Sequence, residues 1–208
     1  EDQKKIMLDN TRQFLKGLPA NNALLWGSRG TGKSSIVKAL LNEYGKEGLR
    51  VIQVEKEDLI YISEIFTAVE SQPYRFIMLC DDLTFEMGEL SYKMLKSALD
   101  GSVYSAPENV LIYVTSNRRY LLPEYEGDHL GGKYVKGEMQ QSEIQEEKSS
   151  LSDRFGLWVP FHVFSQDRYL EAVKLCIERF SAQLNRDIPL TKDLEMAAIK
   201  WSQEKTKR

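Results

Sequence analysis

The sequence contains little of what disulfide frameworks, zinc sites and membrane spans are built from. Its 208 residues include only two cysteines and two histidines, and the histidines share no metal-ligand spacing with the cysteines. We therefore expect no zinc site, and we expect Cys80 and Cys176 to be small buried side chains of a reducing compartment. No apolar run reaches the ~20 residues of a membrane span, and no cleavable signal pattern opens the sequence. These absences predict a cytoplasmic protein without a membrane partner.

An excess of positive charge is also lacking. The net charge is −3 and there is no long run of Lys and Arg, which removes the simplest electrostatic case for binding nucleic acid. A local basic patch formed by Arg118, Arg119 and residues 205–208 keeps such a partner open as a hypothesis. The two arginines can equally well pair with Glu124 or Glu126.

Apolar runs rich in β-branched residues alternate with helical patterns, which predicts an α/β fold with a parallel sheet covered on both faces. The expected strands are residues 23–26, 50–54, 75–80, 110–115 and 157–161, and the expected helices are residues 3–15, 32–46, 58–71, 86–99, 166–184 and 191–204. Ser165 and Thr191 are the expected N-caps of the last two helices.

The same patterns divide the chain into three parts. We expect an N-terminal linker helix in residues 1–18, an α/β core in residues 19–164 and a helical lid in residues 165–208, and we expect the lid to be incomplete. Within the core, the polar, glycine-containing segment around 124–150 is too long for an ordinary connection and predicts a flexible insertion with a short helix near 139–148.

One loop fits the phosphate-binding pattern G-x-x-x-x-G-K-[ST] at every fixed position. It follows the first predicted strand and opens onto a helical pattern, which distinguishes it from a flexible glycine turn. Backbone N–H groups that converge at a helix N-terminus bind anions. Lys33 would then reach the β- and γ-phosphates, and the Ser34 hydroxyl would ligate Mg²⁺. The predicted nucleotide-binding residues are Gly27, Ser28, Arg29, Gly30, Thr31, Gly32, Lys33, Ser34 and Ser35.

Polar side chains follow two later strands. Asp81 and Asp82 end the strand 75–80, and Asn117 follows the strand 110–115. Ligands of open parallel sheets bind beyond the carboxyl ends of the strands, so Asp81 is expected to hold Mg²⁺ and Asp82 to polarise the attacking water. Asn117 has the donor and acceptor to orient that water and contact the γ-phosphate. The alternatives are a purely structural Asp-Asp pair and an Asn117 that caps a following helix.

Arg154 precedes the last predicted strand in the stretch Ser152-Asp153-Arg154-Phe155-Gly156. A planar guanidinium suits a transferring phosphoryl group, so Arg154 is a candidate arginine finger for the ATP of a neighbouring subunit. The alternative is a surface pair between Asp153 and Arg154.

The chain resembles an AAA+ ATPase in the order of these features. The phosphate loop comes first, followed by the acidic strand end, the Asn at a strand tip, the Arg before the last strand and the helical lid. The stretches Leu24-Leu25-Trp26-Gly27, Cys80-Asp81-Asp82-Leu83 and Thr115-Ser116-Asn117-Arg118-Arg119 most closely resemble an uncharacterised bacterial AAA+ family, domain of unknown function family 815. The resemblance implies a five-stranded parallel sheet with strand order 5-1-4-3-2, ATP with Mg²⁺, and assembly into a homo-oligomeric ring or filament.

Two departures from the usual AAA+ pattern qualify the expected activity. Asp82 stands where Glu is usual, and a carboxylate about an ångström out of place can cost ~10² in rate. No arginine in the predicted lid clearly matches the one that AAA+ lids supply to ATP, and we expect it to lie beyond residue 208. The leading hypothesis is an ATPase (a hydrolase) that remodels or loads a macromolecular partner, and the alternative is an ATP-dependent binding switch or loader. A P-loop kinase for a small metabolite fits poorly.

Overall fold

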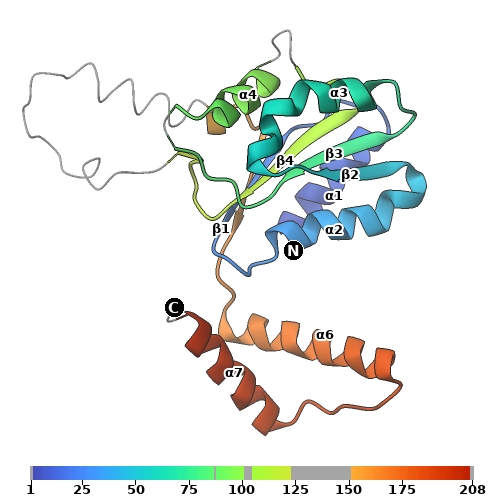
Figure 1. The fold of residues 1–208 in the computed structure, drawn as a ribbon. Helices are drawn as coiled ribbons and strands as arrows, with labels where there is room; N and C mark the ends of the chain where they lie inside the picture. Colours follow the sequence, from blue (N-terminus) through green and yellow to red (C-terminus); the bar gives the residue numbers. More distant parts are fainter. Residues whose placement is uncertain (1, 87, 101–104, 123–150, 207–208) are drawn as a thin grey trace, which may run out of the picture. The chain divides into compact units, whose positions relative to one another are not determined.

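The computed structural model describes residues 2–86, 88–100, 105–122 and 151–206 of the chain (Figure 1). The predicted insertion, its short helix, Glu124 and Glu126 lie outside the described residues. The chain forms two compact units, Glu1–His162 and Val163–Arg208.

The first unit alternates helices and strands. Its elements are α1 (Asp2–Leu15), β1 (Ala23–Gly27), α2 (Lys33–Tyr44), a short 3₁₀ helix (Gly45–Glu47), β2 (Leu49–Gln53), a second 3₁₀ helix (Lys56–Tyr61), α3 (Ile62–Glu70), β3 (Arg75–Cys80), α4 (Leu90–Leu99), β4 (Val110–Ser116) and β5 (Leu157–Phe161). All five predicted strands are present within one residue of their expected ends.

All strand pairs in the sheet are parallel, and the strand order is β2-β3-β4-β1-β5. This confirms the order expected from the resemblance, read from the other edge. β1 lies between β4 and β5, with Trp26 opposite Ser116 on one side and Pro160 on the other. The carboxyl ends of β1, β3 and β4, where the candidate site residues stand, therefore meet at one edge of the sheet.

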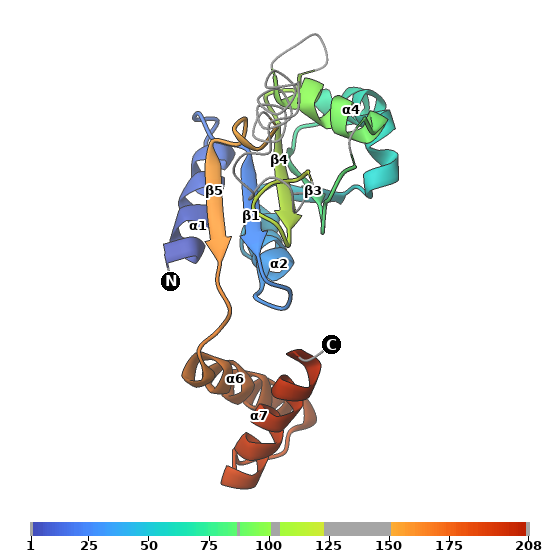
Figure 2. The ribbon, with the colours of Figure 1, turned by 90° about the vertical axis from the view of Figure 1, so that its left-hand side faces the viewer.

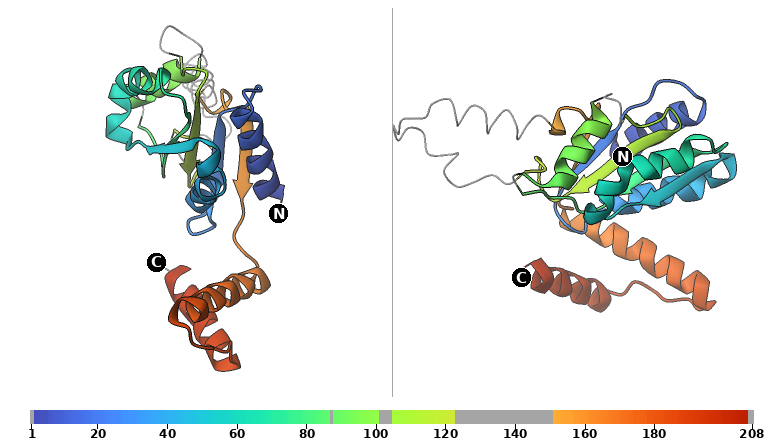
Figure 3. Two further views of the ribbon diagram at one scale, coloured as in Figure 1. Left: turned by 90° about the vertical axis from the view of Figure 1, so that its right-hand side faces the viewer. Right: turned by 45° about the horizontal axis from the view of Figure 1, so that its top comes forward.

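Helices cover both faces of the sheet (Figures 2 and 3). Alternate strand residues enter opposite cores, because successive side chains of a strand point to opposite faces. Leu24 and Met78 join the core beneath α3 and α4, whereas Leu25 and Ile77 join the core beneath α1 and α2. The near-continuous apolar strands thus reflect burial on both sides.

α1 packs against the sheet as part of the first unit. Met7 and Phe14 are buried beneath it, and two polar side chains fix its position. Asn10 Nδ2 donates to the hydroxyl of Tyr113 on β4 at 3.0 Å, and the Thr11 hydroxyl lies 3.2 Å from the same oxygen. Buried polar groups that satisfy one another in this way hold one defined arrangement.

Three expectations were wrong. The α-helix predicted over 58–71 begins at Ile62, because its first four residues belong to the 3₁₀ helix Lys56–Tyr61, where the Ile62 N–H bonds the Leu59 oxygen three residues back. The helix predicted over 86–99 begins at Leu90, because the carboxylate of Glu89 accepts from the backbone N–H of Glu86 at 2.8 Å and from Lys56 Nζ at 3.1 Å, which holds Glu89 outside the helix. Cys80 is buried as expected, and burial raises the pKa of its thiol to about 12. Cys176 is exposed, because a unit of two helices has too little core to bury its small side chains.

The second unit consists of α6 (Gln166–Leu184) and α7 (Lys192–Thr206). Both predicted N-caps are confirmed. The Ser165 hydroxyl accepts from the backbone N–H of Arg168 at 3.4 Å, and the Thr191 hydroxyl accepts from that of Leu194 at 3.3 Å. Among the described helices of the chain, none has the length and apolarity to cross a bilayer.

Candidate nucleotide-binding site

The phosphate loop leaves the carboxyl end of β1 and turns into α2, as its sequence predicts. Three of its glycines have positive φ angles, at Gly27 (136°), Gly30 (75°) and Gly32 (96°). Gly32 is the N-cap of α2 and brings no side chain to the first N–H groups of that helix. The loop residues Gly27 to Ser35 therefore lie at a helix N-terminus, where N–H groups and the helix dipole favour an anion.

Gly27 is also required by a close approach of two strands. A Cβ on Gly27 would lie 2.0 Å from the backbone oxygen of Phe161, its partner on β5, whereas a Cβ on Gly48, which also has positive φ, meets nothing within 4 Å. We expect Gly27→Ala to lower the free energy of unfolding by more than ~3 kcal/mol and Gly48→Ala by ~1 kcal/mol from backbone strain alone. Urea unfolding of both variants measures the difference. Equal losses in the free energy of unfolding would show that β1 and β5 move apart to accommodate the added Cβ.

Lys33 is largely buried at 7% exposure. Its ammonium donates to the backbone oxygens of Gly27 at 2.7 Å and Ser28 at 2.9 Å, and to Asn117 Oδ1 at 3.0 Å. Burial lowers the pKa of Lys33, the carboxylates of Asp82 and Asp81 oppose that shift, and the charge of Arg29 adds to it. The ammonium is therefore enclosed by three oxygen acceptors.

Asp81 meets two hydroxyl groups at the end of the sheet. Its Oδ1 accepts from the hydroxyls of Ser34 and Thr115, each at 2.5 Å. Ser34 and Asp81 were predicted as the Mg²⁺ residues, and the structure brings them into direct contact. Thr115 was missed by the sequence reasoning. Its position in β4, two residues before Asn117, could have indicated it, since adjacent parallel strands end at the same edge.

Asp82 has the backbone conformation of a strained residue, with φ 53°. Its backbone N–H donates to the Thr115 hydroxyl at 2.9 Å, Asn117 Nδ2 donates to its Oδ1, and Arg29 Nη2 lies 3.4 Å from its Oδ2. A non-glycine residue in this region costs on the order of 1 kcal/mol or more. The contacts with Arg29 and Asn117 hold the Asp82 carboxylate beside the phosphate loop.

Asn117 is half-buried and bridges Lys33 and Asp82. Residues 117–122 form bends, so Asn117 does not cap a helix directly after β4. Six of the predicted residues therefore lie in one contiguous set of hydrogen bonds, in which Thr115 joins Asp81 to Asp82: Arg29, Lys33, Ser34, Asp81, Asp82 and Asn117.

Arg154 lies at the opposite edge of the sheet. It precedes the amino end of β5, whereas the phosphate loop follows the carboxyl end of the parallel strand β1. The length of the strands, at ~3.3 Å per residue, separates the two by at least ~13 Å. Arg154 Nε contacts Asp100 Oδ1 at the C-cap of α4, with both side chains about one third exposed (29% and 32%). The sequence offered Asp153 as the alternative partner of Arg154, and the partner in the structure is Asp100.

Arg118 and Arg119 follow Asn117. The Arg119 guanidinium lies 5.8 Å from the ring centres of Trp26 and Trp158 and 5.7 Å from that of Tyr120. Cation–π contacts of this length are modest in energy at an exposed site. Pairing with Glu124 or Glu126 falls outside the described residues.

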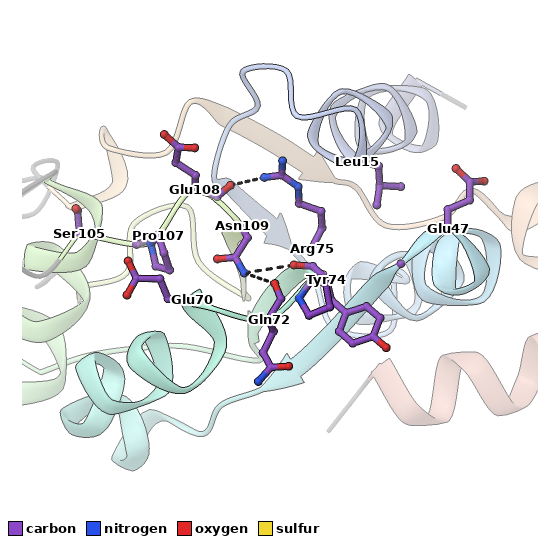
Figure 4. A pocket seen from close by; sticks show the side chains of 13 residues that line it. Leu15, Glu47, Glu70, Gln72, Tyr74, Arg75, Ser105, Pro107, Glu108 and Asn109 are labelled. Carbon is purple, nitrogen blue, oxygen red and sulfur yellow. Dashed lines mark hydrogen bonds between the residues drawn. The ribbon is translucent and has the colours of Figure 1, made fainter.

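A cavity of about 820 Å³ lies at the amino ends of β3 and β4, away from the phosphate loop (Figure 4). Two side chains in it bond backbone oxygens. Arg75 Nη1 donates to Glu108 at 2.7 Å, and Asn109 Nδ2 donates to Val69 at 2.8 Å. These bonds tie the segment before β4 to the end of α3 and the start of β3, and none of the predicted site residues lines the cavity.

The fold and the site define the class of protein. A five-stranded parallel sheet in the order β2-β3-β4-β1-β5, a phosphate loop after β1 and an acidic pair after β3 make this an AAA+ P-loop core. The chain belongs to the family described as "Protein of unknown function (DUF815)", whose model matches residues 1–208.

Solved structures support the same fold. The chain is similar to the Thermotoga maritima RuvB Holliday junction branch migration motor, with 19% identity and a TM-score of 0.57 over 94% of this chain and 54% of that one. It is also similar to the Aeropyrum pernix ORC1 protein in complex with DNA, with 15% identity and a TM-score of 0.56 over 86% of this chain and 49% of that one. The chain spans about half the length of these structures.

A curated relative matches a shorter stretch. The replication factor C large subunit of Nanoarchaeum equitans is 40% identical over 65 residues, which are 31% of this chain and 15% of that protein.

Proposed function

We propose that this chain binds ATP with Mg²⁺ and hydrolyses it, and that the cycle remodels or loads a macromolecular partner. The observation that carries the proposal is the set of contacts joining the phosphate loop to the ends of β3 and β4. Lys33, Asn117 and Asp82 form one branch of it, and Ser34, Asp81 and Thr115 form the other. Each residue type matches the part that phosphoryl transfer needs at that place.

The donor set at Ser34 and Asp81 fits Mg²⁺. A hydroxyl and a carboxylate 2.5 Å apart are hard oxygen ligands, and Mg²⁺ takes one or two such protein ligands while keeping waters and substrate phosphates. The described residues contain no group of three or more His, Cys, Asp and Glu that would form an all-protein metal site. When bound, the ion would neutralise charge on the β- and γ-phosphates. Thr115 holds Asp81 in place for it.

Asp81→Asn is expected to weaken the dependence of ATP affinity on Mg²⁺. The amide keeps the size of the side chain but loses its charge, so the gain in affinity on adding Mg²⁺ should fall by ~10-fold or more, and hydrolysis should fall with it. Calorimetric titration of ATP with Mg²⁺ and with a chelator measures both affinities. Asp9→Asn is the matched control, because Asp9 is an acidic residue outside the site, paired with Arg12 on α1. An Asp81→Asn protein that still responds to Mg²⁺ as the native one does would exclude Asp81 as the ligand.

Assembly into a homo-oligomer follows from the position of Arg154 if it acts as an arginine finger. A residue at the amino edge of the sheet cannot reach the ATP of its own subunit across ~13 Å of strand. It would serve a neighbour in a ring or filament. The similar structures include a Holliday junction branch migration motor and a protein in complex with DNA, so nucleic acid is one macromolecular partner to test, with Arg118 and Arg119 as candidate contacts.

The alternative is an ATP-dependent binding switch, and Asp82 is the observation in its favour. Its side chain is one methylene shorter than Glu, and Asn117 and Arg29 already engage both of its oxygens. Sedimentation with ATP, with ADP and without nucleotide separates the two functions. ATP-dependent assembly without phosphate release above that of Lys33→Ala would favour the switch.

A further inference from the structure

The phosphate loop carries a second cation besides Lys33. Arg29 is the third residue of the loop, its side chain is 82% exposed, and its Nη2 lies 3.4 Å from Asp82 Oδ2. An exposed ion pair of this kind contributes ~0–1 kcal/mol. Stability therefore does not account for an arginine at this place, and the guanidinium can leave Asp82 at little cost.

Arg29 is the last member of a chain of side-chain contacts that begins at Lys33. Lys33 Nζ bonds Asn117 Oδ1 at 3.0 Å, Asn117 Nδ2 bonds Asp82 Oδ1, and Asp82 Oδ2 faces Arg29. The charge of Arg29 is also close enough to contribute to the lowered pKa of Lys33. Since the phosphate-loop lysine reaches the β- and γ-phosphates, a guanidinium held beside the same residues lies on the γ-phosphate side of the site.

We propose that Arg29 is a further catalytic residue, whose guanidinium turns from Asp82 to the γ-phosphate of ATP in the same subunit. This inference rests on the proposed ATPase function. Two consequences follow from the geometry. The γ-phosphate gains a planar donor that matches the charge spread over its equatorial oxygens. Asp82 loses its cation partner at that moment and becomes free to accept from water.

The reaction that Arg29 assists is a simple displacement. A bond forms between the oxygen of water and the γ-phosphorus, and the bond from the γ-phosphorus to the β,γ-bridging oxygen breaks. The bonding electron pair leaves with ADP, and the proton of the attacking water passes to Asp82 and then to solvent. Without nucleotide, the pair between Arg29 and Asp82 keeps this carboxylate engaged.

The test compares ATP with ADP, because only ATP has the γ-phosphate. Calorimetric titrations with Mg²⁺ are made on the native chain, Arg29→Ala and Arg29→Lys, and phosphate release is measured on the same samples. Arg12→Ala is the matched control, since Arg12 forms an exposed Arg–Asp pair with Asp9 at 3.3 Å on α1, outside the site. Melting curves check that the variants fold. We expect them to fold, because the Arg29 side chain is exposed.

Arg29→Ala is expected to reduce the preference for ATP over ADP by ~10-fold, the effect of one charge-assisted hydrogen bond, while ADP affinity stays within about twofold. The rate of hydrolysis should fall by ~10- to 100-fold. Arg29→Lys should recover part of the preference for ATP, because it keeps the charge and loses the planar fork. Arg12→Ala should change neither quantity.

An unchanged ATP-to-ADP preference and rate in Arg29→Ala, with binding still lost in Lys33→Ala, would overturn the role of Arg29 and leave the ATPase proposal standing. Equal weakening of ATP and ADP would also overturn it, since Arg29 would then support the loop and not the γ-phosphate. A native chain that binds neither nucleotide would overturn both proposals.

Discussion

Lys33→Ala is expected to lower ATP affinity by at least ~100-fold and to reduce hydrolysis to background. The Lys33 ammonium makes three bonds, two to backbone oxygens of the loop and one to Asn117 after β4. Each one exchanged for a phosphate oxygen is a charge-assisted bond of ~1.5–3 kcal/mol. Calorimetry measures the affinity, and phosphate release measures the rate. Lys38→Ala is the matched control, because Lys38 is an exposed lysine of the same helix, α2.

Native-like ATP affinity in Lys33→Ala would mean that the loop does not hold the phosphates. A melting curve close to that of the native chain is needed alongside, so that lost binding is not mistaken for lost folding. The Lys38→Ala control should match the native chain in affinity, rate and melting temperature.

Arg154→Ala is expected to lower the turnover of ATP by about 10³-fold while ATP affinity changes by less than twofold. An arginine finger contacts the transferring phosphoryl group in the transition state, and its removal costs 10³–10⁵ in rate in the systems where it acts. Single-turnover and steady-state phosphate release on the assembled protein measure the loss. Arg154→Lys should not recover the rate, because the ammonium lacks the planar fork.

A mixing experiment tests whether Arg154 acts on a neighbour. Arg154→Ala keeps an intact nucleotide site, and Lys33→Ala keeps an intact Arg154, so mixed assemblies should regain turnover that neither variant has alone. Asp100→Ala is the control for structure, because it breaks the same ion pair and leaves the guanidinium available. Activity in the mixture no greater than the sum of the two variants, or a loss in Asp100→Ala as deep as in Arg154→Ala, would contradict a finger acting between subunits.

The sequence predicted the strands and the phosphate loop well because each has a strong local signal. Near-continuous apolar runs such as Phe76 to Cys80 are typical of strands buried on both faces, and the glycines of the loop are needed at positive φ. The meeting of Lys33, Asp81, Asp82 and Asn117 followed from one rule, that parallel strands end at the same edge.

The errors fell where long-range contacts decide the structure. The late start of α4 at Leu90 depends on Glu89 reaching Lys56, which is distant in sequence. The ion pair between Arg154 and Asp100 joins the segment before β5 to the end of α4, and Thr115 on β4 bonds Asp81 at the end of the neighbouring strand β3. The exposed Cys176 shows that an amphipathic pattern does not secure burial in a unit of two helices.

The measurement that tests the central claim most directly is phosphate release from ATP with Mg²⁺ over roughly a hundredfold range of protein concentration, with Lys33→Ala beside the native chain. The account predicts a rate per protomer that rises with concentration as subunits assemble, and no release above background in Lys33→Ala. Release from the native chain no greater than that of Lys33→Ala at every concentration would contradict it.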